Sequence, residues 1–491
     1  MTVGGRSINP GTGFCLAIAL YFSLHLFLRV GFSDSLELDE AEQWLFVQWL
    51  DWGYSSQPPL YTWLLKGLFA IFGESILITA LTKNLCLCAL YGVTFLLARR
   101  VLGDEPRAVL AALSLLLMPP IAWEASRDLT HTVLVACWVP ASLLVVLNLL
   151  QQPTLRMYGL FGLVMGLGFL SKYNFSVHAV ALLLSLLSLG EGRRILLNRR
   201  ILLSGLLASL MYLPHGLWML DHQLELSRGM VKLGLTAHHS LIPSSKLAIS
   251  VAAYTAPLLL IVGLVWGFRQ AERPKLVATP ETRILTRYLL MVLLIVWVGM
   301  SFVDSGHIRT RWLFPFMVVL PVWLYTQIPA AAMSPLRSRL HLGCVGVAAS
   351  SILVLMVLRV PGAAWTQKST DLNLPFTTVA DDLRQAGFTR GIIVAANAHM
   401  AGNLRYQFRD QAQVLTPQLD FHWPERPVAP KVLLFWEAEK RDEMPEALSA
   451  FAQDHLGVDA HTLKPHYLLH PYRYSESLKS KMAYVVVSLA H

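Results

Sequence analysis

The hydrophobic residues of this chain fall into long runs that are separated by short polar stretches. A helix that crosses the hydrocarbon core of a bilayer, roughly 30 Å thick, needs about 20 consecutive apolar residues. About eleven of the runs approach that length, so we expect each of them to form a membrane-spanning helix. Their approximate limits are 12–31, 75–98, 107–123, 131–150, 157–171, 175–190, 201–219, 247–268, 286–303, 312–328 and 341–360.

Basic residues mark every second connection between these runs, for example Arg99 and Arg100 after the second run and Arg193 and Arg194 after the sixth. Cytoplasmic loops of membrane proteins are enriched in Lys and Arg. With the N-terminus inside, the first loop, residues 32–74, therefore faces outward, and this loop is acidic. The pattern predicts a multi-pass protein of the bacterial inner (plasma) membrane whose first loop lies on the periplasmic side.

The pattern changes after residue 360, where charged residues and prolines return. Short runs rich in β-branched residues alternate there with amphipathic stretches, which is typical of an α/β domain. The runs lie at 391–398, 431–436 and 483–489. We therefore expect residues 1–360 to form a transmembrane domain and residues 361–491 to form a soluble extracytoplasmic α/β domain.

The composition agrees with this division and excludes a soluble enzyme. Hydrophobic residues make up 55% of the chain, charged residues make up 14%, and the mean hydropathy is +0.50. The formal net charge of +9 comes from short clusters between apolar runs, so it reports membrane topology and not a nucleic-acid partner. Cys86 and Cys88 are two residues apart and would point to different faces of a helix, which argues against a metal or redox pair.

The first outer loop combines acidic residues with many aromatic residues directly after a predicted span. Asp39 begins an acidic segment that leads into an aromatic-rich run, as expected of a helix lying at the membrane interface, and Gly53 would end that helix. Pro59 is placed to open a second interfacial helix, because the first turn of a helix does not need its missing N–H.

Two features of this loop carry a family resemblance. The acidic pair Asp39-Glu40 follows the first span, and the motif Pro-Pro-Leu-Tyr-Thr-Trp-Leu follows at 58–64. Together they resemble the GT-C glycosyltransferases that include protein mannosyltransferases and lipid A aminoarabinose transferases. The resemblance covers residues 10–360 and implies a helical bundle with a lipid-linked donor site between the membrane and the outer loops.

The wider motif narrows the resemblance to one branch. Ser56-Gln57 stand where the aminoarabinose branch has Glu-Lys, and the pattern from Gly53 to Leu64 looks closer to rhizobial lipopolysaccharide galacturonosyltransferases. This resemblance implies an inverting glycosyltransferase that moves a sugar, such as galacturonic acid, from a polyprenyl-phosphate donor. The implied acceptor is a glycolipid such as lipid A or lipopolysaccharide core.

Three other functions remain open at this stage. A protein O-mannosyltransferase would use the same fold and donor chemistry. A lipid-linked sugar flippase or transporter should carry ionisable residues along the middles of its spans, whereas most charges here lie at helix ends, with Lys83 as an exception. A non-catalytic membrane scaffold would not depend on Asp39.

The transfer reaction requires a base for the acceptor hydroxyl and positive charge to stabilise the leaving phosphate. The acceptor hydroxyl must lose a proton as it attacks, and the leaving phosphate gains negative charge. We expect Asp39 to be the base, with Glu40 as the second candidate. The structural alternative is that Asp39 caps a helix in a capping box with Glu42.

A second acidic position lies between the third and fourth predicted spans. The resemblance implies that Asp128 orients the acceptor or holds a metal together with Asp39, whereas the structural alternative makes it the N-cap of the fourth helix. The sequence identifies no definite cofactor, and for a divalent metal the weak candidate ligands are Asp39, Asp128 and His222. The spacing of His222, His238 and His239 fits no compact metal motif, so solvated loop histidines are the simpler interpretation.

Several further residues are expected to bind the donor. Lys172, in a segment at 166–176 that resembles an element of the same family, would bind the donor phosphate, and Tyr173 would lie beside the sugar or the isoprenoid. Alternatively, Lys172 only reaches from a helix end toward the interface. The resemblance also places Gln57 and Tyr61 of the proline motif in the donor site.

Two arginines lie on the side where the topology rule disfavours them. Arg309 and Arg311 follow the ninth predicted span, and a guanidinium offers paired donors that suit a phosphate. The structural alternative is an ion pair with Asp304.

Overall fold

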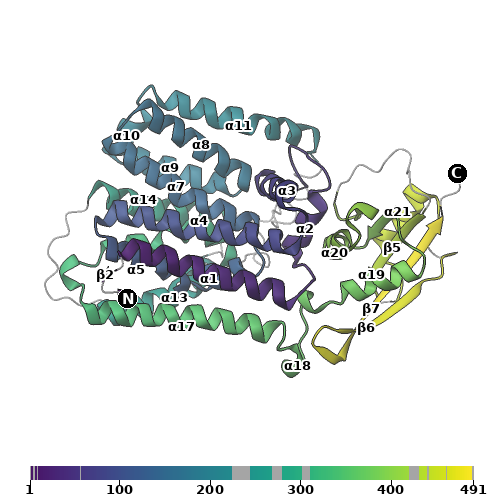
Figure 1. The fold of residues 1–491 in the computed structure, drawn as a ribbon. Coiled ribbons are helices and arrows are strands. Elements are labelled where there is room, and N and C mark those ends of the chain that lie inside the picture. The colour runs from purple at the N-terminus through teal and green to yellow at the C-terminus, as the bar shows by residue number, and fades with distance from the viewer. Residues whose placement is uncertain are drawn as a thin grey trace. The chain divides into compact units, whose positions relative to one another are not determined.

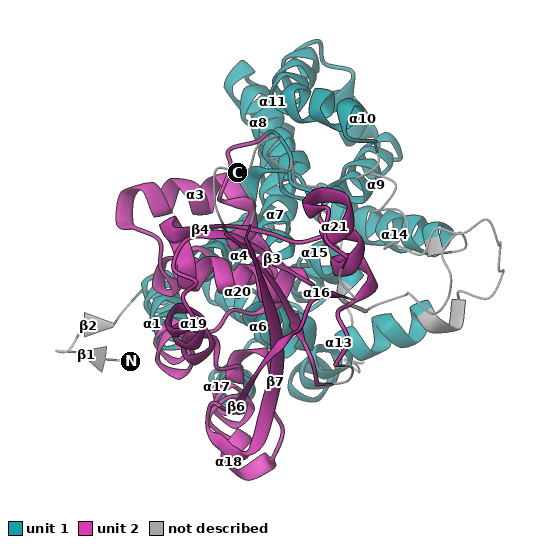
Figure 2. Cartoon of the chain, turned by 90° about the vertical axis from the view of Figure 1, so that its right-hand side faces the viewer, with its two compact units in different colours: residues 1–24, 52–61, 83–352 teal, residues 25–51, 62–82, 353–491 magenta. Residues whose placement is uncertain are grey.

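The computed structural model describes residues 2–3, 6–7, 9–55, 57–223, 244–267, 279–300, 310–419, 431–439, 442–459 and 462–488. The chain divides into two compact units (Figure 2). Unit 1 comprises residues 1–24, 52–61 and 83–352, and unit 2 comprises residues 25–51, 62–82 and 353–491.

Unit 1 is built from helices (Figure 1). The long ones that lie wholly or mainly in it are α4 (Ile76–Leu102), α7 (His131–Gln151), α8 (Leu155–Ser171), α9 (Phe175–Leu187), α11 (Ile201–Asp221), α13 (Ser244–Trp266), α14 (Pro280–Met300) and α17 (Pro335–Arg359). The shorter ones are α5 (Glu105–Leu113), η1 (Ser114–Leu117), η2 (Pro120–Glu124), α6 (Ala125–Arg127), α10 (Gly190–Leu196), η3 (Thr310–Leu313), α15 (Phe314–Met317), α16 (Leu320–Thr326) and η4 (Ala330–Ala332). Helix α1 (Pro10–Phe32) starts in unit 1 and ends in unit 2.

Each of the predicted hydrophobic runs contains helix in the described part of the chain. Within that part, seven helices are long and apolar enough to cross a membrane, or up to nine if two bent pairs each count as one span. Two shorter apolar stretches, Leu155–Ser171 and Phe314–Thr326, match the remaining predicted runs. The structure thus confirms a mostly helical protein with several apolar helices, and the count of about eleven spans stays a prediction.

The bent pair Glu105–Leu117 and Pro120–Arg127 turns by 79° at its break. Proline disfavours helical backbone in the residue before it, and Met118, which precedes Pro119, is extended with φ −107° and ψ 103°. The two consecutive prolines therefore explain why this predicted span is not one straight helix.

Helices α8 and α11 lie side by side at a glycine-lined contact (Figure 1). A Cβ atom added to Gly162 would lie 2.6 Å from the backbone oxygen of Ser204, and one added to Gly166 would lie 2.8 Å from the sulfur of Met211. Small residues spaced four apart let membrane helices approach closely. The hydroxyl of Ser204 adds a hydrogen bond of 2.6 Å to the carbonyl of Tyr158.

Unit 2 joins most of the first loop, residues 32–74, to the C-terminal part of the chain. The loop supplies α2 (Leu38–Phe46) and most of α3 (Leu60–Phe72), and Trp44 is fully buried between the ring of Phe69 and the ring of Tyr406. The indole N–H of Trp44 donates a 3.0 Å hydrogen bond to Thr79. Helix α2 packs closely on α20 (Ala398–Phe408), because a Cβ atom on Gly402 would lie 2.1 Å from the carbonyl oxygen of Ala41.

The C-terminal part contains a five-stranded sheet with the order β4-β3-β5-β7-β6. Strand β3 pairs in parallel with both β4 and β5, and β7 pairs antiparallel with β5 and β6. The strands are β3 (Gly391–Ala395), β4 (Ala412–Leu415), β5 (Lys431–Glu437), β6 (His466–Tyr472) and β7 (Ser475–Ser488). Two short strands, β1 (Thr2–Val3) and β2 (Arg6–Ser7), form a separate antiparallel pair.

Helices cover both faces of the five-stranded sheet. Leu448 and Ala452 of α21 (Glu446–Leu456) pack on the face formed by residues such as Ile392 and Val394. Helix α19 (Phe376–Gln385) and α20 cover the opposite face. The short elements α18 (Ala363–Thr366) and η5 (Asp371–Asn373) lie between α17 and α19, and η6 (Arg409–Gln411) lies between α20 and β4. The predicted mixture of helices and strands after residue 360 is therefore confirmed.

Candidate functional site

Helix α2 begins one residue before Asp39. Glu37 occupies the N-cap position, and its backbone N–H donates a 3.2 Å hydrogen bond to the carboxylate of Glu40. The capping box is thus formed by Glu37 and Glu40. The predicted alternative, a capping box of Asp39 and Glu42, is wrong because the helix starts at Leu38 and places Asp39 inside its first turn.

Glu40 is held in a buried ion pair. Its carboxylate lies 2.5 Å from the guanidinium of Arg29, which also donates to the backbone oxygens of Ser33 and Ser35 at 3.2 and 2.8 Å. Glu40 is 1% exposed and Arg29 is 6% exposed. These contacts fix the turn between the first span and α2, whereas Asp39 in the same turn is only half-buried.

Further ion pairs tie the start of the loop to the C-terminal part of unit 2. Glu37 pairs with Arg359 at the end of α17, and Asp34 lies 2.6 Å from the guanidinium of Arg473. Burial by itself lowers the pKa of Arg473, but the interactions with Asp34 and Tyr474 together raise this pKa above its ordinary value. These ion pairs therefore hold the backbone around Asp39 in place within unit 2.

In unit 1, two predicted donor-site residues meet at the start of α7. Lys172 follows the end of α8, and its ammonium donates a 2.6 Å hydrogen bond to the hydroxyl of Thr132. Tyr61 is fully buried, with its ring 5.5 Å from the ring of His131. His131 Nδ1 lies 3.1 Å from the carbonyl oxygen of Ser171, the residue before Lys172. Lys172 and Tyr61 therefore both contact the first two residues of α7.

Tyr173 belongs to a row of aromatic rings in unit 1. Its ring stacks on that of His215 at 5.7 Å, His215 stacks on Trp218 at 5.9 Å, and Trp218 stacks on His222 at 4.2 Å. His215 Nδ1 donates a 2.7 Å hydrogen bond to the carbonyl of Trp52. His222, predicted as a weak metal candidate, thus lies in an aromatic stack.

Sequence reasoning did not single out His215 or Trp218, because both fall inside the apolar run 201–219. The available signal is the spacing of His215, Trp218 and His222, which places them on one face of α11. Gly53 packs directly against the ring of Trp218, because a Cβ atom on Gly53 would lie 2.3 Å from that ring. Gln57 closes the turn that follows, through backbone hydrogen bonds of 3.1 and 2.9 Å with Tyr54.

Asp128 lies in the break between the third and fourth predicted spans. It follows α6, and its N–H donates to the carbonyl of Glu124 at 3.1 Å. The alternative that Asp128 caps the fourth helix is wrong, because α7 starts at His131 and its N-cap is Thr130. The buried Lys83 reaches this segment and donates a 3.1 Å hydrogen bond to the carbonyl of Arg127.

The remaining candidates are divided between the units or lie outside the described residues. Arg309 is not among the described residues, and neither is the side chain of Arg311. In the part of the chain that the structure describes, no three His, Cys, Asp or Glu residues gather as a metal site. Asp39 belongs to unit 2, and Asp128 and Lys172 belong to unit 1.

This chain is similar in sequence to proteins of known function. A family model for dolichyl-phosphate-mannose-protein mannosyltransferases matches residues 56–218. The chain is 31% identical over 453 residues to the lipopolysaccharide core galacturonosyltransferase RgtB of Rhizobium johnstonii, with 90% of this chain and 91% of the relative covered. It is also 31% identical over 440 residues to the lipopolysaccharide core galacturonosyltransferase RgtA of the same organism, with 87% and 86% covered.

Among solved structures, the fold is similar to that of ArnT from Cupriavidus metallidurans bound to undecaprenyl phosphate. The TM-score is 0.65 at 14% sequence identity, and the match covers 98% of this chain and 99% of ArnT. The same protein in the apo state gives a TM-score of 0.60. At this identity the likeness shows the fold, which extends through both the helical bundle and the C-terminal sheet.

Proposed function

Because this chain belongs to the GT-C glycosyltransferases of the lipopolysaccharide galacturonosyltransferase branch, we propose that it transfers galacturonic acid from a polyprenyl-phosphate carrier to the lipopolysaccharide core or lipid A. The observation that carries the proposal is the 31% identity to RgtB over 90% of the chain. Membership makes the chain a glycosyltransferase and a multi-pass protein of the bacterial inner membrane. The undecaprenyl phosphate bound to ArnT supports the choice of carrier.

The proposed reaction is a direct displacement at the anomeric carbon of the donor sugar. Asp39 takes the proton from the acceptor hydroxyl, whose oxygen forms the new glycosidic bond as the bond to the phosphate oxygen breaks. Attack opposite the phosphate inverts the anomeric centre. Asp39 suits this role because it lies in the first turn of α2, whose N-terminus stabilises a negative charge, and because its side chain is only half-buried.

Positive groups stabilise the phosphate that leaves. We assign this role to Lys172 and to the arginines Arg309 and Arg311. The bond from Lys172 to Thr132 supports the assignment of the lysine, because it holds the ammonium near the end of α8 instead of leaving it to extend along the lipid. Tyr173 lies next to the sugar or the isoprenoid in this proposal.

The other candidates position the two substrates. Tyr61 and Gln57 lie beside the donor in this proposal. The ring of Tyr61 is held next to that of His131, and the backbone of Gln57 is held by its hydrogen bonds with Tyr54. Asp128 orients the acceptor hydroxyl, with or without a divalent metal. The acidic first loop and the basic alternate loops support a periplasmic position for the whole site.

A protein acceptor is the second candidate, since the matching family model describes protein mannosyltransferases. The two functions differ in the molecule that receives the transferred sugar and therefore gains its mass. Lipid A and core oligosaccharide are therefore to be compared by mass spectrometry with periplasmic glycoproteins from the same cells.

The deciding experiment uses a gene deletion complemented with the native chain, with Asp39→Asn or with Asp51→Asn. We expect the deletion and Asp39→Asn to lack one hexuronic acid on the core or lipid A, and the native chain and Asp51→Asn to restore it. In purified form, Asp39→Asn should lose about 100-fold or more in transfer rate, which is the usual contribution of a general base. An unchanged glycan profile in the deletion strain would contradict the proposed acceptor.

A further inference from the structure

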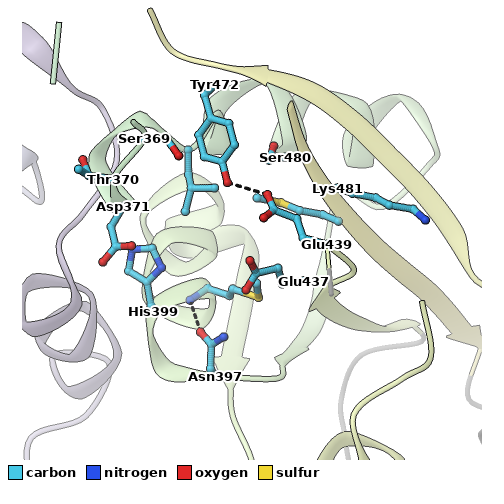
Figure 3. Close-up of a pocket in the computed structure, with 13 residues that line it drawn as sticks. Ser369, Thr370, Asp371, Asn397, His399, Glu437, Glu439, Tyr472, Ser480 and Lys481 are labelled. Carbon is cyan, nitrogen blue, oxygen red and sulfur yellow. Dashed lines mark hydrogen bonds between the residues drawn. The ribbon is translucent and has the colours of Figure 1, made fainter. Parts of the chain in front are cut away.

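Two groups of like-charged side chains lie outside the residues assigned to the reaction. One lines a polar hollow in unit 2, where Figure 3 shows Asp371, Glu437 and Glu439, and where Glu439 accepts a 2.6 Å hydrogen bond from Tyr472. The other lies in unit 1 and is called the arginine surface below. It consists of Arg156, Arg193, Arg194, Arg199 and Arg200, all of which are exposed. The arginine surface is the group that the surrounding helices place at a membrane boundary.

The arginine surface lies where apolar helices of unit 1 start and end (Figure 1). Arg156 is the second residue of α8, Arg200 directly precedes α11, and the other three arginines lie in or just after α10. Helix α10 follows α9 after a bend of 116°, because Leu189 between them is extended with φ −119° and ψ 139°. Since α9 runs alongside the apolar helix α14, a helix bent by this angle runs more nearly along a membrane surface than across the membrane.

Helix α10 is docked on the helical bundle through its other face. Ile195 is buried, and its carbonyl accepts a 3.0 Å hydrogen bond from the hydroxyl of Tyr158 in α8. Gly192 packs closely as well, because a Cβ atom on it would lie 2.3 Å from the carbonyl oxygen of Leu186. Membrane topology needs only positive charge in a connection between spans. Here the charge is held on a helix with a fixed position in unit 1.

The positive charge of the arginine surface is not neutralised by the neighbouring sequence. Glu191 is the only acidic residue from 151 to 200, and it pairs with Arg283 at the start of α14. The connection between α13 and α14, residues 268–279, carries three basic residues and one acidic residue in the sequence, so it adds positive charge. Arg200 donates a hydrogen bond to the carbonyl of Pro153. Within the described residues, no side-chain hydrogen bond or ion pair is made by Arg156, Arg193, Arg194 or Arg199.

Apolar side chains are exposed next to these arginines in the chain. Leu197 is 80% exposed, and Leu155 and Leu202 are also exposed. Leucines and basic residues exposed together are typical of a helix at the boundary of a bilayer, where the leucines enter the acyl chains and the basic groups meet the lipid phosphates. A guanidinium offers paired donors that fit phosphate oxygens.

The charge pattern of the whole chain predicts that this end of unit 1 faces the cytoplasm, where anionic lipids make the membrane surface negative. We propose that the arginine surface binds the phosphate groups of anionic phospholipids of the inner membrane. A zwitterionic phospholipid binds more weakly, because its own amine offsets the charge of its phosphate. This proposal depends on neither the sugar nor the acceptor of the transfer reaction.

The test measures lipid binding to the full-length protein by native mass spectrometry in a non-ionic detergent. Titration with cardiolipin or phosphatidylglycerol should show tighter binding than titration with phosphatidylethanolamine. Arg193→Gln with Arg194→Gln should weaken cardiolipin binding about tenfold or more, because two basic groups near the lipid phosphates are lost. The matched control is Arg337→Gln with Arg339→Gln, which removes the same charge at the start of α17 and should bind cardiolipin like the native protein.

A second double variant, Arg193→Lys with Arg194→Lys, keeps the charge and should keep the preference for anionic lipids. Equal affinity of the native protein for all three phospholipids would overturn the proposal without reference to any variant. Native cardiolipin affinity in the glutamine variant, or the same loss in the control, would also overturn it. Undecaprenyl phosphate is titrated in parallel. If the glutamine variant loses more affinity for undecaprenyl phosphate than for cardiolipin, the surface binds the carrier lipid and the proposal is wrong.

Discussion

Two neighbouring carboxylates, Asp39 and Glu40, have different environments in the structure. Glu40 is paired with a buried arginine, whereas Asp39 is half-buried in the same helical turn. The sequence motif predicts an acidic pair at this place, but it does not show that Glu40 is the member bound by Arg29. That distinction depends on Arg29, which comes from the preceding span, and on the exact start of α2.

Substitution of Glu40 should therefore lower the stability of the protein, whereas substitution of Asp39 should lower its activity. Glu40→Gln is expected to lower the free energy of unfolding by about 3–5 kcal/mol, because it leaves the buried charge of Arg29 without its partner. Asp39→Asn is expected to leave the melting temperature unchanged and to lose sugar transfer. Thermal unfolding of both purified variants in detergent checks this, and a melting temperature equal to that of the native protein for Glu40→Gln would contradict it.

Residues that depend on distant parts of the chain are the ones that sequence reasoning missed. The motif around Lys172 and the proline motif at Tyr61 were predicted separately, and the structure brings them to one scaffold through His131 and Thr132. His131 was not predicted, since a histidine at a helix start has many structural uses. The helical runs could be predicted because the length of an apolar run is a local property of the sequence, whereas the partners of a side chain depend on distant parts of the chain.

At the level of elements, the glycines of α8 have a clear packing role. The α8–α11 contact leaves no room for a side chain at Gly162, and α11 contributes both the backbone of Ser204 and the histidine that stacks on Tyr173. A change in the distance between these helices would therefore reach a proposed donor-binding residue.

Gly162→Ala should destabilise the protein, although alanine normally favours a helix over glycine. Overpacking of this kind costs about 1–3 kcal/mol. The control is Gly205→Ala in α11, where an added Cβ would meet no atom within 4 Å, so that variant should be neutral or slightly stabilising. Melting temperatures of the two variants check the prediction, which is wrong if both behave alike.

For the whole molecule, the charge pattern predicts an orientation in the membrane. The charge pattern predicts that Leu50 in the first loop faces the periplasm and that Gln152 between α7 and α8 faces the cytoplasm, and both side chains are exposed. Leu50→Cys and Gln152→Cys, each in a variant lacking the native cysteines, place a single thiol on each predicted side.

In intact cells, a maleimide that cannot cross the inner membrane should label Leu50→Cys and spare Gln152→Cys. After lysis both should react. Labelling of Gln152→Cys in intact cells would reverse the predicted topology and move the proposed site to the cytoplasmic side.

The contact between the first loop and helix α20 affects the order in which parts of the protein can fold during synthesis. The N–H of Leu36 is bound by the side chain of Asn403, 367 residues later in the chain. During synthesis the loop emerges early, and its binding partners emerge last. The segment that carries Asp39 therefore has to wait for nearly the entire polypeptide, so a ribosome that stalls before the end would release a membrane protein whose proposed catalytic base is not yet anchored.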